Sequence, residues 1–310
     1  MEYATLRAMQ SSASAPEALE RTVSYLAENM RRFVRPQDKV LICFPRDGAA
    51  SLGALFEQAT LKLSGIPLFW SSDHKWMTLL RQSFYSRASV MIGPPLVVLG
   101  LSKLAKATAT PLNIRHVVTA GYPCLDWMIE GIIRGLDCRT WGCFGPGTGA
   151  IVSGFSCGQS LGVHLREDEY DVQILNGEGT SVEDGESGVI TLGHKNDPQN
   201  RIRLRDHGRL DRSVCACGQN SPRLVDIHPA LRFQDDVLAL YQQFHSWTSI
   251  LDCRVVKGAY GLELELVVFP GEKLPKLPTS AKQVIRPWDP ERDMPMDLNP
   301  EFRDGMTGAM

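Results

Sequence analysis

The sequence has no long hydrophobic run, no excess of one charge and no basic leader. Its longest apolar stretch, residues 90–101, is shorter than the roughly 18 residues of a membrane span. The 33 basic and 35 acidic side chains give a net charge of 33 − 35 = −2, and binding to nucleic acid needs a basic face. The first residues lack the basic-then-apolar order of a secretory signal. We therefore expect neither a membrane nor a nucleic acid as partner, and a cytoplasmic location.

The composition is that of an ordinary globular protein. With 310 residues and 43% hydrophobic side chains, the chain is long enough for a large core and for two domains, or for one domain with an appendage. It has eight cysteines and no secretory signal, a combination that favours a reducing compartment. We therefore expect the thiols to bind metal or to lie buried, not to pair.

The first half of the chain alternates predicted helices with predicted strands, after a first helix over residues 16–33. The expected strands cover residues 39–44, 66–70, 89–92, 114–119 and 138–144, and the expected helices cover residues 49–63, 75–84, 95–107 and 125–136. Strand–helix units of this length predict an α/β fold with a mainly parallel sheet flanked by helices. We assign residues 1–149 to this α/β subdomain.

After residue 149 the pattern changes to short strands separated by turn residues. The expected strands cover residues 151–155, 170–175, 189–192 and 202–204, followed by 237–241, 253–257 and 262–269. We predict a small β-rich subdomain, an antiparallel sheet or barrel, over residues 150–231. Residues 232–310 form a reduced α+β C-terminal domain whose tail, from Pro290, is predicted to be frayed.

Four side chains in the β-rich part have the chemistry of a zinc site. Cys157 and His164 flank a turn, and Cys215 and Cys217 follow about fifty residues later. Three thiolates and an imidazole are a closed ligand set for Zn²⁺, which would join two loops of a weakly cored subdomain. The alternative is that Cys157 fills the core and that the close cysteine pair is a coincidence. We expect the other five cysteines to be core residues.

An ordered series of motifs between residues 115 and 285 resembles the phenylacetate–CoA ligase branch of the AMP-forming acyl-adenylate superfamily. The matching segments, in chain order, are 118–123 (VTAGYP, for GGEP), 144–149 (FGPGTG, for aromatic-G-x-T-E), 154–168, 186–192 (ESGVITL), 202–210 (IRLRDHGRL), 215–219 (CACGQ), 232–238 (RFQDDVL) and, more weakly, 277–285. The resemblance covers somewhat over half of the chain.

The resemblance implies a two-step reaction. A carboxylate attacks the α-phosphate of ATP to give an acyl-adenylate, and the thiol of CoA then displaces AMP. It implies ATP with Mg²⁺, CoA and an aryl or other small carboxylic acid as ligands, together with a structural Zn²⁺ on Cys157, His164, Cys215 and Cys217. Four protein ligands leave no open position, so the zinc is not expected to be catalytic.

The resemblance also implies roles for individual residues. Asp206 would hold the ribose hydroxyls, Arg232 would contact ribose or phosphate, and Lys282 would be the adenylation lysine. The residues implied around the nucleotide or acyl group are Phe144, Gly145, Gly147 and Gly121, with Thr148 in the place of the catalytic metal ligand. Each has a structural alternative, as a turn or surface residue.

Several positions depart from the family pattern. Thr148 stands where a Glu would hold Mg²⁺, and Tyr122 replaces the Glu of the strand-end turn. The segment 11–16 (SSASAP) resembles the family's phosphate loop only faintly, and it contains no glycine. The region before it is shortened, which raises the alternatives of a homo-oligomer or a protein partner that completes it.

Three functions remain open on the sequence. The first is a divergent ATP-dependent acyl-activating ligase. The second is a catalytically degenerate relative that binds a small molecule or nucleotide, or scaffolds a partner. The third, redox chemistry at Cys124, lacks a partner cysteine. A run of arginines is expected to serve the phosphates of a nucleotide or of CoA: Arg201, Arg203, Arg205, Arg209 and Arg212.

Overall fold

The computed structural model describes the chain in six segments and one isolated residue. These are residues 12–70, 73–146, 151–229, 235–258, 261–272, 274 and 282–296. The largest element of this part is a sheet of eleven strands, in the order β2-β1-β3-β4-β5-β6-β7-β11-β10-β9-β8. Across the same residues, no helix is both long and apolar enough to cross a membrane.

Five strands at one end of the sheet run parallel. They are β1 (Lys39–Ile42), β2 (Ile66–Phe69), β3 (Val90–Gly93), β4 (His116–Thr119) and β5 (Arg139–Phe144). The helices between them are α3 (Leu52–Lys62), α4 (Trp76–Ser86), α5 (Pro95–Ala107) and α6 (Asp126–Leu136), and α2 (Pro16–Met30) precedes β1. This alternation of helices and strands is the predicted one, and the ends of the elements differ from the predicted ends by at most three residues.

The parallel strands are buried on both faces, which explains their continuous apolar sequences. Along β1, Val40 and Ile42 face one hydrophobic cluster, which also contains residues of α2 and α3. Leu41 and Cys43 face a second cluster, which contains residues of α4, α5 and α6. Successive side chains of a strand point to opposite faces, so the two clusters lie on opposite sides of the sheet.

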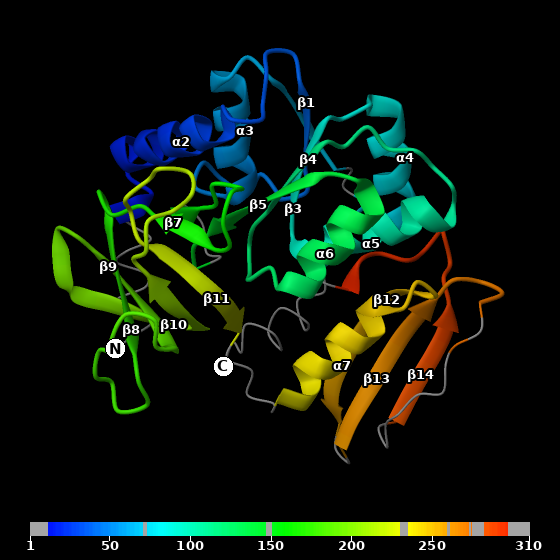
Figure 1. Ribbon diagram of the computed structural model, residues 1–310. Coiled ribbons are helices and arrows are strands. Elements are labelled where there is room, and N and C mark those ends of the chain that lie inside the picture. Colours follow the sequence, from blue (N-terminus) through cyan, green and yellow to red (C-terminus); the bar gives the residue numbers. More distant parts are fainter. Residues whose placement is uncertain are drawn as a thin grey trace.

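The rest of the sheet is antiparallel and begins on β5 itself. β5 pairs with β4 in parallel and with β6 (Gly154–Phe155) in antiparallel. The remaining strands are β7 (Val163–Leu165), β8 (Tyr170–Leu175), β9 (Gly188–His194), β10 (Asp197–Asp211) and β11 (Arg223–Pro229). The predicted β-rich segment is therefore an antiparallel continuation of the parallel sheet (Figure 1), and β7 and β11 were not predicted.

The C-terminal part is a helix packed beside a second sheet. α7 (Asp235–Ser246) precedes β12 (Ile250–Gly258), β13 (Gly261–Val268) and β14 (Lys282–Pro287), which form the sheet β12-β13-β14 (Figure 1). Buried apolar residues of this part, among them Phe244 and Leu266, belong to the same cluster as the residues of α5 and α6. The second sheet therefore shares a hydrophobic core with the parallel half.

The predicted strand over residues 237–241 is wrong, because this segment lies inside α7. Its apolar residues continue to Tyr241 and Phe244 with helical spacing, and both side chains are buried. Asp235 and Asp236 stand at the N-terminus of the helix, where negative charge is favourable. The apolar run 237–241 (VLALY) has the length of a strand, and the helical period becomes complete only with Phe244.

Candidate metal centre and nucleotide site

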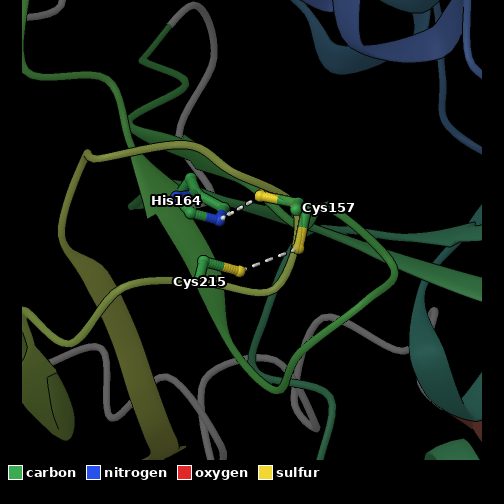
Figure 2. Close-up of side chains that lie close together, drawn as sticks. Cys157, His164 and Cys215 are labelled. Carbon is green, nitrogen blue, oxygen red and sulfur yellow. Dashed lines mark hydrogen bonds between the residues drawn. The ribbon is translucent and has the colours of Figure 1, made fainter.

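The four predicted metal ligands come together from three separate segments. Cys157 follows β6, His164 lies on β7, and Cys215 and Cys217 lie in the loop between β10 and β11. Pairing of Phe155 with His164 across β6 and β7 places the first two ligands side by side. The ligand atoms of all four residues lie within 4.8 Å of one another, and the labelled side chains point toward one centre (Figure 2).

The distances fit a tetrahedral zinc ion. With ordinary Zn–S and Zn–N bonds, the edges of such a tetrahedron measure about 3.8 Å between two sulfurs and about 3.5 Å between sulfur and nitrogen. The Sγ atoms of Cys157 and Cys215 are 3.7 Å apart, and the Sγ of Cys217 is 3.3 Å from Nε2 of His164. None of the eight cysteines forms a disulfide. The donor set and its spacing therefore fit Zn²⁺.

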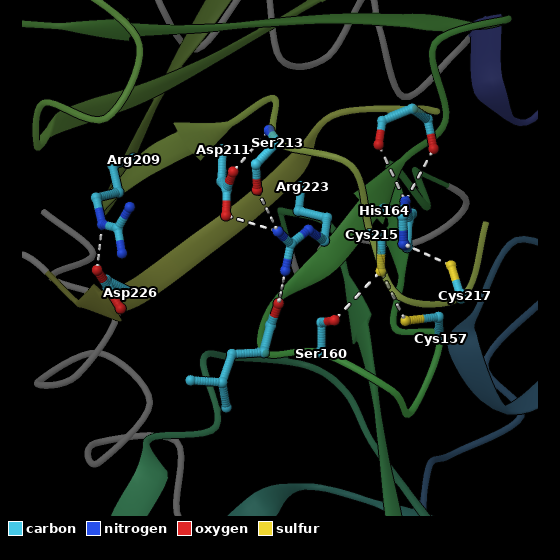
Figure 3. Close-up of polar contacts among 12 residues, drawn as sticks. Cys157, Ser160, His164, Arg209, Asp211, Ser213, Cys215, Cys217, Arg223 and Asp226 are labelled. Carbon is cyan, nitrogen blue, oxygen red and sulfur yellow. Dashed lines mark hydrogen bonds and ion pairs between the residues drawn. The ribbon is translucent and has the colours of Figure 1, made fainter. Parts of the chain in front are cut away.

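The surroundings of the cluster orient its ligands. Nδ1 of His164 lies 3.0 Å from both the carbonyl oxygen and the Oγ of Ser221 (Figure 3). When Nδ1 carries the proton, it donates to Ser221 and leaves the lone pair of Nε2 for a metal, as is usual for a ligating histidine. The backbone N–H groups of Gln159 and Gln219 donate to the Sγ of Cys157 and Cys217, at 3.5 and 3.4 Å.

A buried arginine ties the two cysteine loops together. Arg223 of β11 donates to Oδ2 of Asp211 at 2.6 Å and to Oγ of Ser213 at 3.0 Å. Its other terminal nitrogen donates to the carbonyl oxygen of Leu161 at 3.4 Å (Figure 3). Neither Arg223 nor Ser221 was singled out in the sequence, because their role depends on a strand, β11, that was not predicted.

The pKa values of two thiols in the cluster, Cys215 and Cys217, are shifted in opposite directions. Burial raises the pKa of Cys215, but hydrogen bonds from the backbone of Cys217 and from neighbouring side chains bring this pKa down to about 6. Burial and the neighbouring sulfurs raise the pKa of Cys217. Three thiols this close cannot all ionise without a cation between them, because like charges repel. A divalent cation at the centre would remove this repulsion.

A cavity of about 770 Å³ opens beside the cluster. One wall is formed by Tyr25, Glu28 and Asn29 of α2 and by Arg32 in the turn that follows the helix. The facing wall contains Cys217 and His164 together with parts of both cysteine loops. Arg32 lies over the ring of Trp141, 5.4 Å from its centroid. The cluster is therefore reached from a polar hollow, not sealed inside the core.

The parallel half has a second place where a ligand is expected. In the order β2-β1-β3-β4-β5 the connections reverse direction between β1 and β3, and ligands of such sheets bind at the carboxyl ends of the strands near this point. Gly121 follows β4 with φ +94°, and an added Cβ would lie 3.3 Å from the ring of Phe44, which follows β1. The backbone N–H of Leu96, in the first turn of α5, donates to the Tyr122 hydroxyl at 3.0 Å.

Gly145 stands at a close approach of two chain segments. A Cβ at this position would lie 2.1 Å from the carbonyl oxygen of Ile151, so only glycine fits. Phe144, one residue earlier, is buried and pairs with Gly154. The structure thus gives both residues a local packing role at the end of β5.

Asp206 is a half-buried acid on β10, opposite Pro229 of β11. Burial raises its pKa from the ordinary 3.8 to about 7. Within the described segments, its carboxylate has neither a hydrogen bond nor an ion pair. An acid held in this way is a candidate for a binding site, because burial of an unpaired carboxylate disfavours the folded state.

The other predicted site residues are not brought to Asp206 by any described contact. Gly147, Thr148 and Arg232 lie outside the described residues. Lys282 begins β14, in the three-stranded sheet, and its side chain also lies outside the described part. The structure therefore brings the four candidate metal ligands together, whereas the residues predicted around the nucleotide stay a prediction.

Three arginines of the predicted basic run are paired with acids, and the side chain of a fourth, Arg205, lies outside the described part. Arg201 contacts Asp171, Arg209 contacts Asp226, and Arg212 contacts Asp184. Each of these acids compensates one guanidinium, which leaves less positive charge for a phosphate than the sequence indicates. The side chain of Arg203 is exposed.

Sequence reasoning also missed a buried ionic group beneath α2. Glu169 accepts from Arg166 at 2.5 Å and from Arg21 of α2 at 3.0 Å. Arg166 donates to Oγ1 of Thr22 at 3.1 Å, and both Arg166 and Glu169 are almost fully buried. The charged run at residues 166–169 was the available signal. The group fixes α2, and with it one wall of the cavity, to the antiparallel half.

Comparison with known proteins gives the fold. No family model matches the chain, and no curated protein matches its sequence. Among solved structures, 2-hydroxyisobutyryl-CoA ligase in its postadenylation state with R3-HIB-AMP matches with a TM-score of 0.65 at 13% identity, over 81% of this chain and 58% of that one. The open conformation of that ligase, with 2-HIB-AMP and CoA, matches with a TM-score of 0.61 at 12% identity, over 92% and 70%.

A third structure agrees with these two. A benzoate CoA ligase from Burkholderia xenovorans LB400 matches with a TM-score of 0.55 at 13% identity, over 86% of this chain and 62% of that one. The chain thus shares its fold with these CoA ligase structures. The chain spans 58% of the length of the first matching structure.

Proposed function

We propose that this chain is an acyl-activating ligase of the AMP-forming type, from the phenylacetate–CoA ligase-like branch. It takes a small carboxylic acid through an acyl-adenylate to a CoA thioester. The observation that carries the proposal is Asp206, a half-buried acid without a partner among the described residues, at the place in the IRLRD segment where the family pattern has its ribose-binding carboxylate.

The chemistry of Asp206 suits a ribose. An ionised carboxylate has two oxygens and accepts one hydrogen bond from each of two neighbouring hydroxyl groups. Those hydrogen bonds would stabilise the charged form that burial now disfavours. The shared fold supports this assignment, because the similar 2-hydroxyisobutyryl-CoA ligase has been solved with an acyl-adenylate and with CoA.

The same proposal includes a structural zinc ion. Cys157, His164, Cys215 and Cys217 would hold it, and their spacing matches a zinc tetrahedron. When bound, the ion supplies a link between the loop after β6 and the loop after β10. Four protein ligands leave no position for a substrate, so the zinc belongs to the scaffold and not to the reaction.

A second candidate function is supported by Tyr122. Its hydroxyl accepts from the first turn of α5, at the strand-end turn where the family pattern has a Glu. Together with Thr148 in the place of the Mg²⁺ ligand, this favours a relative that binds a nucleotide without turnover. In that case ATP or AMP would bind, but no pyrophosphate would form.

Calorimetry and a turnover assay separate the two. ATP with Mg²⁺, AMP and CoA are titrated into zinc-loaded protein, and pyrophosphate release is measured with phenylacetate, benzoate and 2-hydroxyisobutyrate. Acid-dependent pyrophosphate release establishes the ligase, and AMP binding without release establishes the second function. Asp206→Asn should weaken nucleotide binding, whereas Asp226→Asn, at an exposed and paired acid, should not. If no nucleotide binds the wild type, both functions are wrong.

A further inference from the structure

The four metal ligands differ in how they meet solvent. Cys157, His164 and Cys215 are buried, with 4%, 4% and 3% of their surfaces exposed. Cys217 is half-buried, and its side chain lines the 770 Å³ cavity between α2 and the cysteine loops. Cys157 also borders this cavity, but it is 4% exposed, so Cys217 is the thiolate of the cluster that a small reagent in the cavity reaches most easily.

Thiols that could form a disulfide with Cys217 lie close to it. The Sγ of Cys217 lies within 4.8 Å of the Sγ atoms of both Cys157 and Cys215. A disulfide needs about 2.05 Å between the two sulfurs, so a shift of a few ångströms in one loop would suffice. The residues around Cys217, which are Ala216, Gly218 and Gln219, are all exposed, so no core packing opposes such a shift.

We propose that Cys217 is an oxidative modification site through which a hydroperoxide releases the metal. This inference rests on the zinc binding proposed above. The Cys217 thiolate attacks the O–O bond, takes one oxygen to become a sulfenic acid, and an alcohol or water leaves. A buried thiolate, of Cys157 or Cys215, then attacks the sulfenic sulfur, forms the disulfide and releases water.

The step balances in atoms and electrons. Two thiolates, one hydroperoxide and two protons give one disulfide, one alcohol and one water, and the two electrons that leave sulfur reduce the O–O bond. Zn²⁺ loses two of its three thiolate ligands and departs into solvent. A thiol reductant would reverse the disulfide and allow zinc to bind again.

The position of the cluster gives this oxidation a structural effect. Its ligands join the loops at β6, β7 and β11, which are the strands that follow β5 in the sheet. β5 ends at Phe144, directly before the segment with the proposed nucleotide contacts. Metal loss would therefore loosen the antiparallel strands next to that segment.

The test begins with the full-length, zinc-loaded protein. Its zinc content is measured first by atomic emission, because a protein without zinc overturns the zinc proposal itself. Limiting iodoacetamide is then added, and peptides are mapped by mass spectrometry. Cys217 should be alkylated at least about tenfold faster than Cys157 or Cys215. Equal or slower alkylation of Cys217 in a protein that does hold zinc overturns this inference alone.

A second experiment follows metal release. Hydrogen peroxide is added beside a chromogenic zinc chelator, and the wild type is compared with Cys217→His. This variant keeps four ligands, so it should still hold zinc and release it about tenfold more slowly. Cys138→Ser, outside the cluster, should release zinc like the wild type. Release from Cys217→His at the wild-type rate would overturn the inference.

Discussion

Nδ1 of His164 lies 3.0 Å from the carbonyl oxygen of Ser221, and this contact leaves Nε2 facing the sulfur of Cys217. A ligand that is oriented in this way before metal arrives loses little freedom on binding. His164 lies on β7, and its acceptor Ser221 lies in the loop just before β11. The two strands pair with each other. The histidine of the metal centre is thus held by the sheet, whereas the three cysteines lie in the loops beside it.

The first prediction concerns the metal content. Purified protein should carry about one zinc per chain, and Cys215→Ser should lose it and lower the free energy of unfolding by several kcal/mol, because zinc binding contributes to folding. Cys138→Ser is the matched control outside the cluster. Metal analysis and urea unfolding measure both effects. Metal-free wild-type protein of unchanged stability would contradict the prediction.

The second prediction concerns the pH dependence conferred by Asp206. Its pKa is about 7 in the folded state and 3.8 as the ordinary value, so the folded state binds the proton more tightly. Stability from this group is fully present below about pH 4 and is lost as the pH rises to 7. Asp206→Asn should therefore stabilise the protein at pH 8 by about 1–3 kcal/mol and much less at pH 4.

Unfolding at both pH values, with Asp226→Asn as control, measures this effect. The same variant should weaken AMP binding. In the wild type, affinity for AMP should rise as the pH increases through 7, because the ribose hydroxyls bind the ionised carboxylate. A variant that is less stable at pH 8 and binds AMP normally would exclude Asp206 from the site.

The third prediction concerns the ionic group beneath α2. Glu169→Gln leaves the buried Arg166 with only the exposed Asp168, 3.8 Å away, as a charge partner, so the free energy of unfolding should fall by about 3–5 kcal/mol. Glu20→Gln, in the exposed pair with Lys62, should change it by less than about 1 kcal/mol. Chemical denaturation of both variants provides the comparison.

The same group predicts an effect of acid. Burial raises the pKa of Glu169, but hydrogen bonds and charges from Arg21 and Arg166 outweigh it and hold this pKa below the ordinary 4.5. The group therefore stabilises the folded state above about pH 4.5, and this contribution should disappear as the pH falls further. An acid unfolding midpoint that Glu169→Gln leaves unmoved would argue against it.

The fourth prediction concerns Tyr122. Tyr122→Phe removes the acceptor for the backbone N–H of Leu96 and should destabilise the protein by about 1 kcal/mol. Tyr85→Phe, at a side chain that is 77% exposed, is the control. Thermal unfolding suffices for the comparison, and equal melting temperatures would show that the hydroxyl does not cap α5.

The parallel half was predictable because each strand and helix has its own periodic signal. Val40 to Ile42 is apolar on both faces, and α2 begins at Pro16, a typical first residue of a helix. β7 has three residues and β11 begins with Arg223, so neither has a readable pattern. Their positions follow from pairing with distant strands.

The metal ligands were predictable because their residue types are rare and their spacing is informative. Ser221 and Arg223, which orient and join them, are ordinary residues whose role depends on tertiary contacts. The motif that predicts Lys282 gives its position along the chain but not its place in the fold. The three-stranded sheet that holds it is defined by pairing with β13.

The dual pairing of β5 has a mechanical consequence. One edge of β5 is hydrogen-bonded to β4 and the other edge to β6. A force or a local opening on either side is therefore transmitted through β5 to the strands on the other side. If the chain were cut after residue 149, the edge of β5 that pairs with β6 would become unpaired and could template aggregation. The two halves of the large sheet should therefore show a single cooperative unit in hydrogen exchange, with the slowest amides on β5 and its neighbours.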